Sequence, residues 1–102
     1  MDDSFVEVVE LYVERASILL ESLADSLAEH DRQQVRIAAH TLKGSSGLVG
    51  AEHLSQLAGS IEAADGDVPL EGLVGAVVAE FGRVEAALRE LVPGLAARPQ
   101  GE

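Results

Sequence analysis

With 102 residues the chain is long enough for one small domain and too short for two, and its 47% apolar and 25% charged residues indicate a globular protein. Its 18 acidic and 7 basic residues give a formal net charge of -11, which argues against a nucleic-acid partner because a phosphate backbone would be repelled. The chain has no cysteine, no apolar run near the ~20 residues that cross a bilayer, and no signal peptide at its start, so we expect a cytoplasmic protein without disulfides or a membrane anchor.

The apolar residues recur with helical spacing along the whole chain, and no segment alternates with the period of two that marks a half-buried strand. Alanine and leucine, both strong helix formers, supply 29 of the 102 positions. The pattern predicts an all-α fold, an antiparallel up-down four-helix bundle over residues 1–92, followed by a flexible C-terminal tail over residues 93–102.

The first predicted helix covers residues 4–29 and carries two apolar rows. The row expected to face the core contains Phe5, Val8, Val9, Tyr12, Ala16, Leu19, Leu23 and Leu27. The row beside it contains Val6, Val13, Leu20 and Ala24. Either a further helix packs on this second row, or part of it is an exposed strip on which a partner docks.

Three further helices are predicted from turn and capping residues. Asp31 is placed to cap a second helix that continues to about Gly47, a third helix covers residues 51–64, and Pro69 suits the first turn of a fourth that ends at Pro93. The residues expected to face the core from these helices are Val35, Ala38, Ala39, Leu42, Ser46, Val49, Leu54, Leu57, Ala58, Ile61, Leu70, Leu73, Val77, Phe81, Val84, Leu88 and Leu91.

The second helix carries a histidine on its outer face. His40 lies about 160° around the helix from Leu42, the centre of the buried face. Lys43 follows one turn later on a flank of the same face, and Gly44 leaves space beside the imidazole at a cost in helix propensity. An outward histidine with a nearby cation and an open approach suits a nucleophile that accepts a phosphoryl group, although a solvated surface pair beside a tolerated glycine gives the same pattern.

Glu62 is the expected partner of His40. Both residues lie 11 positions from Ala51, on opposite sides of the turn between the second and third helices, so an antiparallel hairpin places them at the same height. The residues before Glu62 on its flank, Ser55 and Gly59, are small and allow the helices to approach closely. Glu62 can then accept a hydrogen bond from Nδ1–H of His40, which leaves Nε2 as the nucleophile, unless it is a plain surface glutamate.

Two other kinds of chemistry are not favoured by the sequence. His30 and His53 lie too far along their helices to converge with His40 on a zinc ion. Ser45 and Ser46 have no outward Asp-His pair to activate a hydroxyl, so we expect them to be small packing residues.

The segment His40-Thr41-Leu42-Lys43-Gly44-Ser45-Ser46, followed by Gly50-Ala51, resembles the signature of histidine-containing phosphotransfer (HPt) domains over about residues 4–92. The resemblance implies a four-helix bundle in which His40 is the phosphoacceptor, Lys43 the cation beside the phosphate and Gly44 the residue that keeps the approach clear. Glu62 is similar to the carboxylate of the phosphotransfer domains in chemotaxis-type kinases, whereas relay domains more often carry glutamine there.

The implied function is that of a phosphocarrier without kinase activity of its own. Its partners would be response-regulator receiver domains or a hybrid histidine kinase, and the domain needs no cofactor because the receiver supplies Mg²⁺. We expect a monomer. Two alternatives stay open, namely the phosphoacceptor domain of a chemotaxis-type kinase and a helical binding module that never carries phosphate. The residues expected to contact a partner are Val13, Leu20, Ile37, Gly47 and Leu48.

Overall fold

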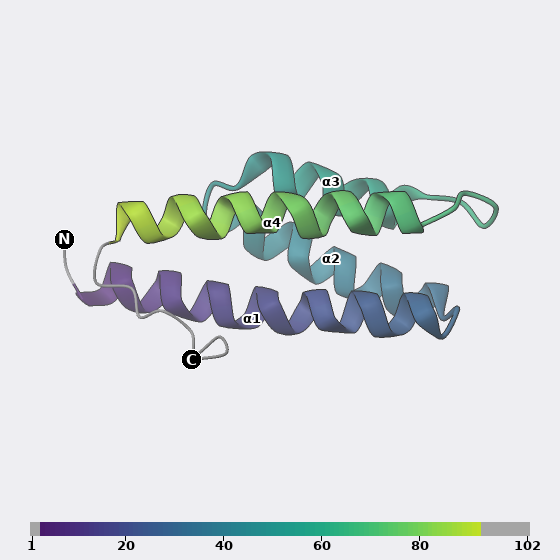
Figure 1. Ribbon diagram of the computed structural model, residues 1–102, viewed down its shortest axis with the longest axis horizontal. Coiled ribbons are helices and arrows are strands. Elements are labelled where there is room, and N and C mark those ends of the chain that lie inside the picture. Colours follow the sequence, from purple (N-terminus) through teal and green to yellow (C-terminus); the bar gives the residue numbers. More distant parts are fainter. Residues whose placement is uncertain (1–2, 93–102) are drawn as a thin grey trace.

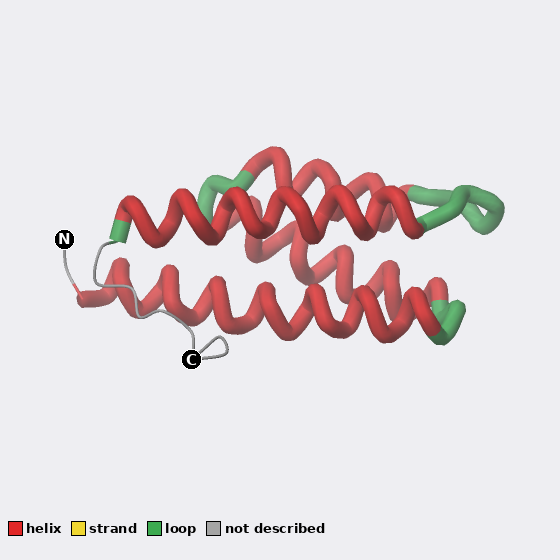
Figure 2. Tube along the Cα trace, in the orientation of Figure 1, coloured by secondary structure: helices red, strands yellow, loops and turns green. Residues whose placement is uncertain are grey.

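The computed structural model describes residues 3–92 and contains four helices. They are α1 (Asp3–Ala28), α2 (Arg32–Leu48), α3 (Glu52–Ala63) and α4 (Glu71–Leu91), joined by short loops (Figure 1). The described part of the chain has no strand (Figure 2), so the predicted all-α class is confirmed. None of the helices in this part is both long and apolar enough to span a membrane. The tail predicted over residues 93–102 lies outside the described residues.

The four helices form a closed bundle. Each helix packs against the next one in the chain, and α4 returns to pack against α1. The contact between α2 and α3 is the most extensive, and that between α1 and α4 is the least. Because connections of a few residues leave no room to cross the bundle, neighbouring helices run antiparallel (Figure 1).

Each of the two tightest loops has as its second residue one in the left-handed backbone region, which turns the chain away from the preceding helix. These residues are His30, with φ 58°, and Gly50, with φ 82°. In each loop the next N–H group bonds to a carbonyl five residues back, as in the 2.9 Å bond from Ala51 to Ser46. The turn at Gly50 therefore fixes where α3 starts relative to α2, and with it which residues of the two helices lie at the same height.

The starts of α2 and α4 differ in how they are capped. The carboxylate of Asp31 accepts a hydrogen bond from the N–H of Gln34 at 3.1 Å, so the predicted cap of α2 is confirmed. Helix α4 begins at Glu71 with Leu70 at its cap position, and no side chain caps it. Pro69 lies just before that cap residue, so the prediction that it occupies the first turn is wrong by a small margin.

The core lies along the bundle axis, and α2 contributes to it as predicted. The apolar residues expected on the inner face within α2 are buried, and Ser46 is completely buried among them. Val49, which was expected on the same face, follows the end of the helix and is partly buried. The hydroxyl of Ser46 lies 2.9 Å from the hydroxyl of Tyr12 on α1, which satisfies both polar groups. Burial raises the pKa of Tyr12, and the hydrogen bond with Ser46 lowers it by less. The ring of Tyr12 also contacts Phe81 of α4, with centroids 6.4 Å apart.

Several residues of the long helices depart from the prediction. Phe5, Val8 and Leu91 were expected in the core but are exposed. They lie at the end of the bundle where α1 begins and α4 ends, and these helices extend there beyond the turn between α2 and α3 (Figure 1). Val13, in the second apolar row of α1, is only 5% exposed and belongs to the core, so at this position a further helix packs on that row and no docking strip is left open. The wide apolar face of α1 is covered because two helices, α2 and α4, pack on it.

Candidate functional site

His40 projects from the outer face of α2, two residues before the fully buried Leu42. Its imidazole is 70% exposed. The backbone that carries it is firmly placed, because Ala38 and Ala39 immediately before it are both buried against the core. The site is therefore an accessible ring on a rigid helix.

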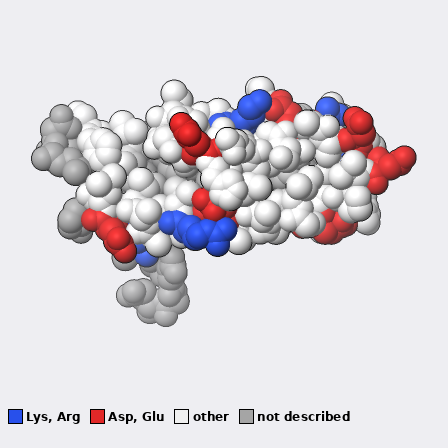
Figure 3. All heavy atoms as spheres, turned by 90° about the horizontal axis from the view of Figure 1, so that it is seen from above, with Lys and Arg blue, Asp and Glu red and all other residues white. Residues whose placement is uncertain are grey.

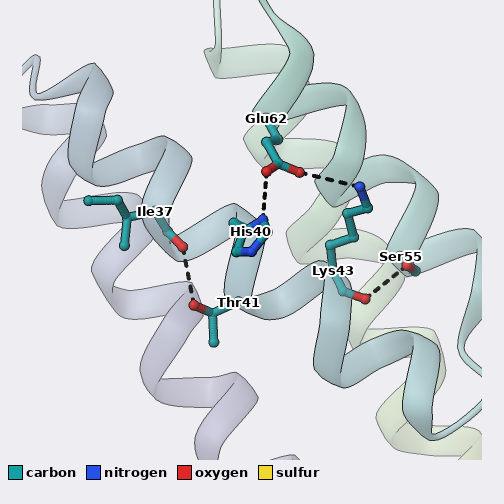
Figure 4. A network of polar contacts seen from close by, with 6 residues as sticks. All are labelled: Ile37, His40, Thr41, Lys43, Ser55 and Glu62. Atoms are coloured by element: carbon teal, nitrogen blue, oxygen red, sulfur yellow. Dashed lines mark hydrogen bonds and ion pairs between the residues drawn. The ribbon is translucent and has the colours of Figure 1, made fainter.

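Glu62 of α3 holds the orientation of this ring. Its Oε2 lies 2.6 Å from Nδ1 of His40, so the predicted contact is present (Figure 4). The hydrogen bond from His40 lowers the pKa of Glu62, although partial burial of the carboxyl acts in the opposite direction. A carboxylate only accepts hydrogen bonds, so Nδ1 must carry the proton and donate it. The lone pair of the ring is then on Nε2, the nitrogen that faces away from Glu62.

Lys43 binds the other oxygen of the same carboxylate. Its Nζ lies 3.4 Å from Oε1 of Glu62, and its side chain is half exposed. The lysine stem passes over Gly59 of α3, where an added Cβ would lie 3.6 Å from the lysine Cδ. Ser55 donates a hydrogen bond of 2.9 Å to the backbone carbonyl of Lys43 (Figure 4). The small residues of α3 thus bring this helix close to α2 and place the carboxylate of Glu62 between the imidazole of His40 and the ammonium of Lys43.

Gly44 lies one turn after His40, and no packing contact requires a glycine at this position. A Cβ built at this position meets no atom within 4 Å, and the backbone is ordinary α-helix. Glycine in a helix interior costs up to ~1 kcal/mol relative to alanine. Because no neighbour within the described chain requires this glycine, the space beside the imidazole is open to an approaching molecule.

A hollow of about 610 Å³ lies on the other side of His40, towards the start of α2. Its walls come from α2, from the end of α3 and from the loop that follows α3. The residues that line it are Arg32, Gln33, Arg36, Ile37, His40, Thr41, Glu62, Ala64 and Gly66. Arg32 is held in place because its guanidinium donates a 2.8 Å hydrogen bond to the carbonyl of Asp65 in that loop. The two arginines were not predicted as site residues, although the absence of any acidic residue between positions 32 and 48 was a signal for them.

The residues predicted to contact a partner fall into two groups. Ile37 and Leu48 on α2 are 51% and 90% exposed, and Gly47 is exposed beside Ser55. On α1, Leu20 is partly buried against the core, and Val13 is buried, so its predicted exposure is wrong. Of the residues predicted for partner contact, the exposed apolar ones therefore belong to α2.

The other histidines lie away from this site. Nδ1 of His53, at the start of α3, is 3.4 Å from a carboxylate oxygen of Glu80 on α4. Within residues 3–92, no three or more histidine, aspartate or glutamate side chains come together in a group that could hold a metal ion. Ser45 donates to the carbonyl of Leu42 within its own helix, so its hydroxyl is used locally.

Comparison with known families agrees with this geometry. The Hpt domain model matches residues 7–97, a span that includes α2, α3, α4, all of α1 except its first four residues, and every residue of the site. No curated protein and no solved structure gives a significant match. Domains of this family transfer phosphoryl groups through a histidine in phosphorelay signalling, and they are carriers rather than kinases by themselves. The chain belongs to the Hpt domain family.

Proposed function

We propose that His40 accepts a phosphoryl group from the aspartyl phosphate of one response-regulator receiver domain and passes it to an aspartate of another. The observation that carries this proposal is the 2.6 Å contact between Nδ1 of His40 and Glu62. It directs the free lone pair to Nε2 on a ring that is 70% exposed, so the reacting nitrogen is accessible to a partner.

The transfer is a single displacement at phosphorus. The lone pair of Nε2 attacks the phosphorus in line, the P–O bond to the aspartyl oxygen breaks, and the aspartate leaves as a carboxylate. The proton on Nδ1 stays in its hydrogen bond with Glu62, whose negative charge balances the positive charge that develops on the ring. The reverse sequence at a second receiver regenerates His40.

Lys43 and Gly44 assist in different ways. Lys43 follows His40 by one helical turn and shares the carboxylate of Glu62 with it. On release from Glu62, its ammonium can offset the roughly two negative charges of the bound phosphoryl group. Gly44 leaves the approach open for the walls of a receiver active site. In this proposal the domain has no cofactor of its own, and Mg²⁺ belongs to the receiver.

The test is phosphoryl transfer from purified receiver domains. Receivers from the genome that encodes the chain are phosphorylated, freed of donor, and mixed with the wild-type domain and with a His40→Gln variant in Mg²⁺. We expect acid-labile, alkali-stable label on the wild type only, with a His53→Gln variant labelled normally as the matched control. Equal labelling of the His40→Gln variant would contradict the assignment.

A second function, the phosphoacceptor domain of a chemotaxis-type kinase, is favoured by one observation. The partner of His40 is a carboxylate, Glu62, as in the domains of those kinases, and not the glutamine that is more frequent in relay domains. Labelling by an ATP-binding kinase domain, combined with no labelling from any receiver, would establish this alternative. A failure of both donors would leave a helical module that binds a partner without carrying phosphate.

A further inference from the structure

Helix α2 differs in charge from the rest of the molecule. The chain has a net charge of -11, yet α2 contains no aspartate or glutamate, whereas each of the other three helices has at least two. Arg32, Arg36 and Lys43 are on this helix, so it holds three of the seven basic residues of the chain. The helix that presents His40 is thus the one positively charged helix of an acidic domain.

These positive charges lie on the same outer face of α2 as His40. Arg36 is one helical turn before His40, and Arg32 is one turn before Arg36, so the three side chains form a row. Both arginines line the hollow beside the imidazole, in which Glu62 is the single acidic residue. The charge of Glu62 is balanced by Lys43, and its other oxygen accepts the hydrogen bond from His40. The hollow therefore presents net positive charge to a partner.

Arg36 is exposed and makes no ion pair or hydrogen bond among the described residues. The arginines of α4 behave differently, because Arg83 binds Glu80 at 2.8 Å and Arg89 binds Glu85 at 3.0 Å. On the face over α3 and α4, the acidic and basic side chains are scattered among neutral ones, without a large patch of one sign (Figure 3). A free arginine beside the proposed phosphoacceptor is available for an intermolecular contact.

We propose that Arg36, supported by Arg32, recognises a carboxylate on the rim of the receiver surface that docks over His40, while the exposed Ile37 packs on an apolar part of that surface. This inference rests on the proposed function and adds to it the chemistry of the partner. A receiver active site contains acidic side chains that hold Mg²⁺. The negative net charge of this domain therefore repels a receiver that approaches most of its surface. The basic face of α2 favours the one orientation that brings Nε2 to the aspartyl phosphate.

The position of the hollow indicates a partner group rather than the transferred phosphoryl group. His40 lines the hollow together with Arg36 and Glu62, and its Nε2, where the phosphoryl group would be attached, points away from the Glu62 side. Lys43, which does not line the hollow, is the cation left for the phosphoryl group.

The test compares Arg36→Gln with Arg83→Gln, which change the net charge equally, and with Arg36→Lys, which leaves it unchanged. Transfer from the receiver that labels the wild type fastest is measured with Arg36→Gln, Arg36→Lys and Arg83→Gln, at about 0.1 M and about 1 M salt, where the screening lengths are about 10 Å and about 3 Å. We expect Arg36→Gln to lower kcat/KM on the order of fivefold at the lower salt, with the difference largely lost at the higher salt. The rate at saturating receiver should not change, Arg36→Lys should keep most of the wild-type value, and Arg83→Gln should match the wild type.

Two results would overturn the proposal. Equal effects of Arg36→Gln and Arg83→Gln would mean that only the overall charge matters. A defect of Arg36→Gln that persists at saturating receiver, with faster hydrolysis of the isolated phosphohistidine, would place Arg36 on the phosphoryl group instead. Absence of transfer to the wild type from every receiver is a different result, because it rejects the proposed function itself and with it a receiver as the partner.

Discussion

At the level of single residues, the carboxylate of Glu62 receives two donors at once, Nδ1–H of His40 at 2.6 Å and Nζ of Lys43 at 3.4 Å. Each donor uses a different oxygen, so the carboxylate fixes both side chains relative to α3. A glutamine in this position would offer one acceptor oxygen, and Lys43 would lose its partner or compete for the same atom. Glu62 therefore determines the tautomer of the histidine and the resting position of the lysine.

This arrangement predicts that the carboxyl of Glu62 titrates at a pH below the ordinary value of 4.5, because its pKa is lowered chiefly by the hydrogen bond from His40. A carboxyl whose pKa is lower in the folded state stabilises the fold above its unfolded pKa, and this contribution is lost as the pH falls through the folded pKa. Carbon-detected NMR titration of the Glu62 carboxyl measures the midpoint. His40→Ala should raise it more than Lys43→Ala does, and a wild-type midpoint at or above 4.5 would contradict the account.

The buried pair Tyr12 and Ser46 gives a second prediction at this scale. Ser46→Ala leaves the hydroxyl of Tyr12 buried without its partner, which should lower the free energy of unfolding by about 1–3 kcal/mol. Replacing both partners, by Tyr12→Phe with Ser46→Ala, removes both polar groups and should cost less than the two single losses added together. Urea denaturation of the four proteins measures this cycle, and strictly additive losses would show that the two hydroxyls do not interact.

At the level of the helices, substitutions at two exposed glycines distinguish an effect on stability from an effect on phosphoryl transfer. Gly44 in α2 and Gly75 in α4 are both exposed helical residues with no atom within 4 Å of an added Cβ. Alanine at either position should stabilise the domain by up to ~1 kcal/mol. Only Gly44→Ala should slow phosphoryl transfer, because its methyl group stands where the receiver must approach. Equal transfer rates for the two variants in a receiver assay would refute this role of Gly44.

The same helices show what apolar spacing can and cannot predict. The buried face of α2 and the outward direction of His40 followed from the spacing, because α2 packs on α1 and α3 along its length. Spacing identifies which side of a helix is apolar, but not how far the neighbouring helices extend. Helix α3 has 12 residues against 26 in α1, so Phe5 and Val8 lie where little of the bundle is left to cover them. Conversely, Val13 is buried because two helices cover α1, which a single sequence does not show.

The candidate site was predictable to a similar extent. The height of Glu62 relative to His40 followed from counting residues from the turn, and the turn geometry at Gly50 makes that count valid. The hollow was not predictable, because its walls come from two helices and a loop whose positions depend on the packing of the whole bundle. A role for Arg36 was not predictable either, because an arginine on a helix is usually an ordinary surface residue and only the hollow shows that it lies beside the site.

At the scale of the whole molecule, the fold concentrates its positive charge on one helix of an acidic bundle. The negative charge on the other helices repels acidic partners. Helix α2, in contrast, combines the exposed Ile37 and Leu48 with the basic side chains around His40. The bundle itself does no chemistry. It holds α2 and α3 in the register that orients the imidazole, and it presents that ring on a rigid support.

The most direct test of this account is to locate the phosphorus atom. The domain, labelled with ¹⁵N in its histidines, is phosphorylated by its receiver and analysed by NMR for ³¹P–¹⁵N coupling. The account predicts a single phosphohistidine, with phosphorus on Nε2 of His40 and the proton retained on Nδ1, next to Glu62. Phosphorus on Nδ1 of His40, or on His30 or His53, would contradict it.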